Sequence, residues 1–108
     1  MGYQPWYQKQ TYPALQLLLN VEGNPDNITG LAPTAFGLIL RNTSVSPVTD
    51  LIGTGTFTIV TANPAVVTYT FSAADVAQPF SGLLIVTAQF TPTGLAVWDP
   101  IAFVITAD

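Results

Sequence analysis

The sequence contains no histidine and no cysteine, and its charged residues number only two basic and six acidic among 108. Histidine is the side chain that enzymes use most often to transfer protons, and cysteine is a strong nucleophile and metal ligand. Because both are absent, we predict a protein that is not an enzyme and that binds no cofactor and no metal. The lack of cysteine also excludes a disulfide framework.

Positive charge is scarce, since Lys9 and Arg41 are the only basic residues and the formal net charge is −4. A chain with this charge repels the phosphates of nucleic acids and anionic lipids. We therefore expect neither nucleic acid nor a membrane as a partner. No apolar run approaches the roughly 20 residues that a membrane-spanning helix needs. The apolar segment 14–21 also lacks the basic residues that precede the apolar part of a signal peptide. We therefore expect no signal peptide.

Apolar side chains, in contrast, are abundant: hydrophobic residues make up 49% of the chain and charged residues only 7%. Charged residues usually make up about a quarter of a soluble domain. So few charges leave the surface of a free monomer poorly hydrated. We therefore expect partner molecules to cover much of this surface in the functional assembly.

Alternation of apolar residues with a period of two begins near residue 13 and predicts β-strands. The expected strands are residues 14–21, 34–42, 56–61, 66–71, 82–90 and 96–107, the last divided at Asp99-Pro100. The four residues between 61 and 66 predict an antiparallel hairpin. Both faces of residues 82–90 are apolar, which predicts a central strand. Residues 44–55 are expected to form a loop.

Six or seven short strands in one domain predict an all-β fold, an antiparallel β-sandwich of about seven strands with immunoglobulin-like topology. We place this domain at residues 13–108. Residues 1–12 are predicted to form an extended N-terminal arm. Its aromatic side chains are the kind that interfaces bury, and we expect them to contact another subunit. They are Tyr3, Trp6, Tyr7 and Tyr12. The alternative is that this segment folds back as an edge strand of its own domain.

Two further groups of residues suggest sites. Trp98, together with Trp6 and Tyr7, is a candidate aromatic platform for sugar rings, although packing in the core is the ordinary role of such a side chain. Asp26 lies close to Asn24 and Asn27, but such residues are typical of turns and predict no metal site.

Several short segments resemble one known family. They are residues 23–31, the Val67-Thr68-Tyr69 segment, Asp75, residues 82–86, residues 90–94, and Trp98-Asp99-Pro100. In this order they resemble the immunoglobulin-like domain at the N-terminus of upper baseplate proteins of tailed bacteriophages, which also occurs in other tail and capsid accessory proteins. A separate domain with an aromatic arm is similar in plan to the capsid decoration, or cement, proteins of phage heads.

The resemblance implies a virion structural protein that is assembled in the host cytoplasm. Its partners would be copies of itself, with a trimer favoured, and a major capsid protein or a tail or baseplate protein. Tyr69, Asp75 and Gly82 would form one structural corner, with Arg41 paired to the Asp75 carboxylate; the alternative is that both charges are simply solvated. A carbohydrate-binding or adhesin-type module at the virion or cell surface is the alternative function.

Overall fold

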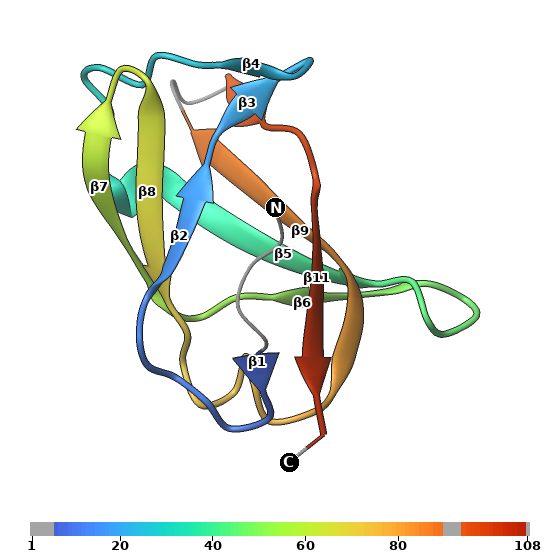
Figure 1. Ribbon diagram of the computed structural model, residues 1–108. Helices are drawn as coiled ribbons and strands as arrows, with labels where there is room; N and C mark the ends of the chain where they lie inside the picture. Colours follow the sequence, from blue (N-terminus) through green and yellow to red (C-terminus); the bar gives the residue numbers. More distant parts are fainter. Residues whose placement is uncertain (1–5, 90–93, 108) are drawn as a thin grey trace.

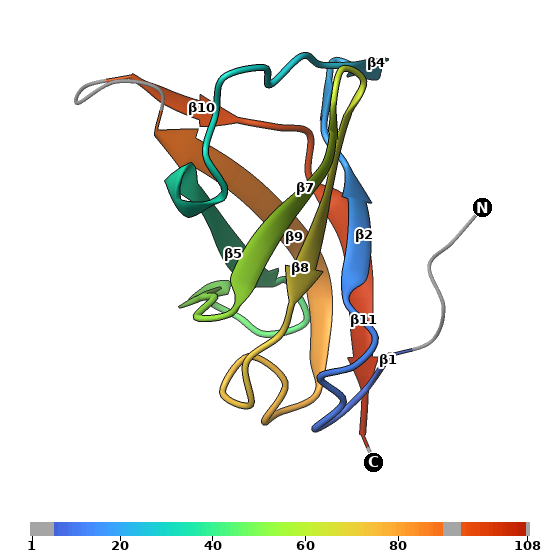
Figure 2. The same cartoon turned by 90° about the vertical axis from the view of Figure 1, so that its left-hand side faces the viewer.

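The computed structural model describes residues 6–89 and 94–107 of the chain. Within these residues the chain forms strands and one short 3-10 helix, η1 (Pro33–Ala35). The all-β prediction is therefore confirmed. Two sheets face each other, and Figure 2 shows strands of the smaller sheet crossing in front of the larger one.

The larger sheet has six strands. Their order is β1 (Trp6–Tyr7), β11 (Ile101–Thr106), β9 (Phe80–Gln89), β5 (Phe36–Asn42) and β6 (Thr49–Ile52), and β10 (Leu95–Val97) also pairs with β9. All its pairings are antiparallel except that of β1 with β11, which is parallel. Strand β9 is central, because it pairs with β5, β10 and β11, as its two apolar faces predict.

The smaller sheet has three strands in the order β2 (Leu15–Leu18), β8 (Ala65–Thr70) and β7 (Thr56–Ala62). Strands β7 and β8 form the predicted antiparallel hairpin. Two-residue strands β3 (Asn20–Val21) and β4 (Asn24–Pro25) pair above it, as Figure 1 shows.

Two expected segments differ from the structure. The strand expected at 14–21 is interrupted at Leu19, so that Asn20–Val21 forms β3, which pairs with β4 across the turn at Glu22 and Gly23. The expected loop at 44–55 contains β6, which pairs with β5 from Ile39 to Asn42. The residues of β6 show no alternating burial, because all four are exposed at the edge of the sheet.

The core lies between the two sheets and contains a connected series of aromatic rings. Neighbouring ring centres along the series are 4.8–6.0 Å apart. The rings belong to Trp98, Phe36, Phe57, Tyr69, Phe71, Trp6 and Phe103. Since such tilted and offset pairs are favourable beyond the area they bury, this series joins the two sheets along their length.

Candidate interaction surface

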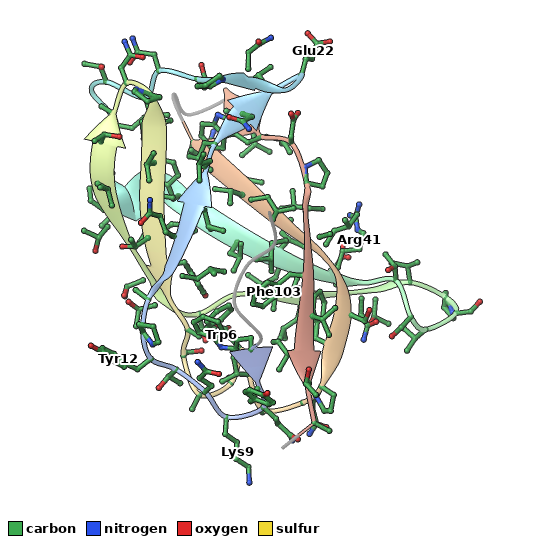
Figure 3. All side chains as sticks on the ribbon, in the orientation of Figure 1. Trp6, Lys9, Tyr12, Glu22, Arg41 and Phe103 are labelled. Atoms are coloured by element: carbon green, nitrogen blue, oxygen red, sulfur yellow. The ribbon has the colours of Figure 1, made fainter. Side chains whose placement is uncertain are left out.

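Trp6 lies in the core of its own domain. Its side chain is only 3% exposed, and its ring centre lies 5.1 Å from that of Phe71 and 6.0 Å from that of Phe103. The indole nitrogen donates a hydrogen bond of 2.7 Å to the carbonyl oxygen of Gln10. Figure 3 shows the labelled Trp6 and Phe103 side chains next to each other.

The prediction that Trp6 contacts another subunit is therefore wrong, and so is a domain boundary at residue 13. Trp6 is opposite Ile105 in the parallel β1–β11 pair, so the segment folds back as an edge strand. Burial of a large aromatic side chain against its own domain is favourable without any partner. Of the other aromatic residues of the expected arm, Tyr7 and Tyr12 are exposed, and Tyr3 lies outside the described residues.

Trp98 is also buried, with 2% of its side chain exposed. Its ring centre lies 5.6 Å from that of Phe36, and its indole nitrogen donates a hydrogen bond of 2.8 Å to Oδ2 of Asp26. A sugar ring cannot stack on a side chain with no free face, so Trp98 is not a ligand platform. Asp26 accepts this bond and one from the backbone N–H of Asn27, so it supports a turn and anchors the indole.

Arg41 does not pair with Asp75. Its Nε donates to Oδ1 of Asp50 at 2.9 Å and one terminal nitrogen donates to Oδ2 at 3.1 Å. The two residues are opposite each other on β5 and β6, so register decides the pairing. This hydrogen bond lowers the pKa of the Asp50 carboxyl below its ordinary value and raises the pKa of Arg41. Because both side chains are exposed, the pair adds little to stability.

Asp75 is buried and organises the corner between β8 and β9. Its carboxylate accepts hydrogen bonds from the Tyr69 hydroxyl at 2.5 Å, the Thr54 backbone N–H at 2.9 Å and the Ser72 backbone N–H at 3.1 Å. The Tyr69 hydroxyl in turn accepts a bond from the Gly55 N–H. Burial, and then the bond to Asp75, raise the pKa of Tyr69 above its ordinary value.

Of the three residues of the predicted corner, Tyr69 and Asp75 are bonded directly, whereas Gly82 lies apart from them. Gly82 lies in β9 opposite Asn42, and a Cβ atom there would lie 2.0 Å from the carbonyl oxygen of Arg41. Glycine thus allows β5 and β9 to approach closely at this point.

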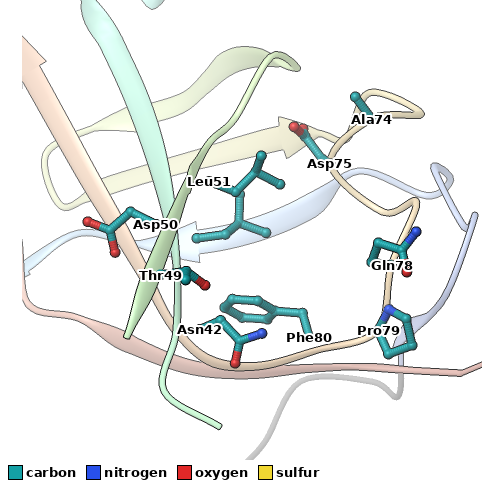
Figure 4. Close-up of a pocket in the computed structure, with 10 residues that line it drawn as sticks. Asn42, Thr49, Asp50, Leu51, Ala74, Asp75, Gln78, Pro79 and Phe80 are labelled. Carbon is teal, nitrogen blue, oxygen red and sulfur yellow. The ribbon is translucent and has the colours of Figure 1, made fainter. Parts of the chain in front are cut away.

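A pocket of about 350 Å³ lies beside this corner, where the smaller sheet does not cover β6. Leu40, Leu51 and Phe80 supply apolar lining, and Asp75 lies at one side (Figure 4). Its two carboxylates, those of Asp50 and Asp75, already accept the hydrogen bonds described above. The pocket therefore offers mainly apolar contacts to a visiting group.

The outer face of the six-stranded sheet is the most unusual surface of the molecule. Residues opposite each other in neighbouring strands point to the same face of a sheet, so the register identifies the members of this face. They are Tyr7, Gly37, Ile39, Arg41, Asp50, Ile52, Ser81, Leu83, Ile85, Thr87, Gln89, Leu95, Val97, Ala102, Val104 and Thr106. We call this set the outer face.

Four large aliphatic side chains on the outer face are open to solvent, whereas Ile85 in the central strand is only 7% exposed. Ile52 is 64% exposed, Leu95 62%, Val97 56% and Val104 54%. The outer face has only two charged residues, Arg41 and Asp50, and they neutralise each other. A solvated antiparallel sheet ordinarily has polar residues on its outer side. The sequence contains part of this signal, because residues 83 and 85 are apolar like their inward neighbours, but the register is needed to assemble the face.

Two other features, a metal site and a membrane-spanning helix, were sought in the described part of the chain. No group of three metal-binding side chains comes together among residues 6–89 and 94–107. Within the same residues, no helix has the length and apolar character needed to cross a bilayer.

Comparison of the chain with protein-family models, with curated proteins and with solved structures found no match in any of the three.

Proposed function

We propose that the protein is a structural subunit of a tailed-bacteriophage virion whose output is binding. Its partners are copies of itself and a neighbouring capsid, tail or baseplate protein, and it reaches the particle by assembly in the host cytoplasm. The observation that supports this proposal is that four large aliphatic side chains of the outer face are more than half exposed, while its two charged side chains pair with each other. Exposed apolar areas of this kind mark interaction sites.

The strand order supports the finer classification as an immunoglobulin-like sandwich. In such folds a B-E-D sheet packs on a sheet in the order G-F-C, to which variable-type domains add C′. The order β2-β8-β7 corresponds to the first sheet and β11-β9-β5-β6 to the second, with the strands taken in chain order. This topology agrees with the resemblance to the phage tail and capsid domains.

The carbohydrate-binding alternative has lost its main support, because the indole of Trp98 is buried. Binding through an apolar sheet face, moreover, fits a protein surface better than a sugar, which presents many hydroxyl groups that need polar partners.

The test is incorporation into virions. Particles of the phage that encodes the chain are purified and analysed by quantitative mass spectrometry, once with the wild-type gene and once with Val97→Lys. We expect the wild-type protein at a fixed copy number per particle and the Val97→Lys protein at a strongly reduced one, because a charge would be buried at the contact.

The matched control is Val60→Lys. Val60 lies in β7 on the smaller sheet and is 52% exposed, close to the 56% of Val97, so its replacement has a similar effect on the free protein. This variant should incorporate like the wild type. Particles that lack the wild-type protein would contradict the proposed function, and equal incorporation of all three proteins would show that the outer face is not the contact.

A further inference from the structure

We infer that the outer face binds the outer face of a second copy of the same chain, so that two six-stranded sheets pack face to face around a two-fold axis. The inference rests on the proposed function in treating binding as the output, and it names the partner of that same surface. The area of the face, its charge and its chemical character support it.

The area is sufficient for a stable contact. The six strands contain 32 residues, and each residue occupies about 3.4 Å along its strand and about 4.8 Å across the sheet. The resulting footprint of about 500 Å² reaches the roughly 500 Å² per partner that a specific interface requires. It also fits within the overall dimensions of the molecule, 38 × 30 × 25 Å.

The charge distribution permits a second copy at the outer face. Each chain has a formal net charge of −4, so two copies repel each other in general. The described acidic groups outside the outer face are Glu22, Asp26, Asp75 and Asp99. On the outer face itself the charges of Arg41 and Asp50 cancel within one chain, at a distance of 2.9 Å. The outer face therefore carries no unbalanced charge, and the negative net charge of the chain does not oppose contact between two outer faces.

The same neutrality argues against a charged partner. A nucleic acid or an anionic membrane needs unpaired basic side chains, and the only basic side chain of the outer face is bonded to Asp50. A two-fold axis brings the same patch of both subunits together, so the apolar side chains of one outer face would meet apolar side chains of the other. Packing of the two sheets would remove Ile52, Val97 and Val104 from water, as the inner faces of sandwiches do.

The first experiment measures the mass of the full chain in solution. Sedimentation equilibrium over a range of concentrations should show reversible association of the 11.5 kDa monomer to a species of twice that mass. Val104→Lys should raise the dissociation constant at least about tenfold, the effect of losing one important interface side chain. Leu18→Lys is the matched control: Leu18 is 52% exposed in β2 of the smaller sheet, against 54% for Val104, and this variant should dimerise like the wild type.

The second experiment identifies the partner as a second copy. Two variants are made in which Ile52, Val97 and Val104 are all replaced, by lysine in one and by glutamate in the other. Each should be monomeric alone, because like charges would meet, whereas an equimolar mixture should form a mixed dimer. Circular dichroism confirms that each variant is folded. Failure of the folded variants to form the mixed dimer would contradict a face-to-face contact.

The result that overturns the inference is a wild-type protein that stays monomeric at high concentration, that forms a trimer, or that dimerises equally well with Val104→Lys. This failure is distinguishable from failure of the proposed function. A monomeric protein that enters virions in a manner sensitive to Val97→Lys would leave the virion role intact and assign the outer face to a different protein. A protein that dimerises through the outer face but is absent from virions would support the dimer and contradict the virion role.

Discussion

Both faces of the six-stranded sheet carry large apolar side chains, but many of these side chains lie in different environments. On the inner face, Leu38, Leu84 and Ile105 are almost completely buried under the smaller sheet. On the outer face, Ile52 and Val97 are more than half exposed. Apolar residues alone therefore do not say which face the chain covers by itself. The difference indicates that the inner face stabilises the fold, whereas the outer face is available for association.

The largest contrast is expected within β1, where neighbouring residues belong to opposite faces. Trp6→Ala should lower the free energy of unfolding by about 3–5 kcal/mol, because a large buried aromatic side chain is lost and a cavity remains. Tyr7→Ala should change it by no more than about 0.5 kcal/mol, because Tyr7 is exposed. Urea unfolding at low protein concentration measures both. Equal effects of the two substitutions would remove the distinction between the faces.

A smaller effect is expected at the buried corner. Tyr69→Phe removes the hydroxyl that donates to Asp75 and accepts from the Gly55 N–H, and should cost about 1–3 kcal/mol at neutral pH. Tyr12→Phe is the control, because Tyr12 is 83% exposed. Thermal unfolding compares the three proteins, and a Tyr69→Phe melting temperature equal to that of Tyr12→Phe would contradict the role given to this hydroxyl.

The same hydroxyl should make the free energy of unfolding depend on pH. Since the pKa of Tyr69 is higher in the folded protein than the value of about 10 in an unfolded chain, its neutral form stabilises the fold fully below pH 10. This contribution should be lost as the pH rises from about 10 toward the pKa of the folded state. Wild-type protein should therefore lose more stability than Tyr69→Phe in this range, as measured by urea unfolding at several pH values.

The smallest effect is expected for the exposed ion pair of the outer face. Arg41→Met should leave the melting temperature almost unchanged, because a solvated pair contributes little. It should, however, raise the pKa of Asp50 toward its ordinary value, which an NMR pH titration of the carboxyl carbon measures. The lowered pKa of Asp50 in the wild type means that its small contribution is present above the ordinary pKa and is lost as the pH falls through the lowered one. A large loss of stability in Arg41→Met would contradict the conclusion that the Arg41–Asp50 pair is solvated and contributes little.

Local sequence patterns were sufficient for the elements whose partners are close in the chain. The β7–β8 hairpin follows from two alternating segments and a short connection, and the central place of β9 follows from its two apolar faces. The sequence pattern did not predict strand β6, because all four of its residues are exposed at the edge of the sheet and show no alternation in burial.

The sequence by itself determined that the chain is all β, poor in charge and rich in apolar side chains that need to be covered. Only the tertiary structure decided which side chains the chain covers on its own. Trp6 lies opposite Ile105, at the other end of the chain, and Arg41 bonds Asp50 because β5 and β6 pair in one particular register. The physical reason is that apolar burial is not directional and depends on contacts distant in sequence, so local patterns identify the residues to be buried but not their partners.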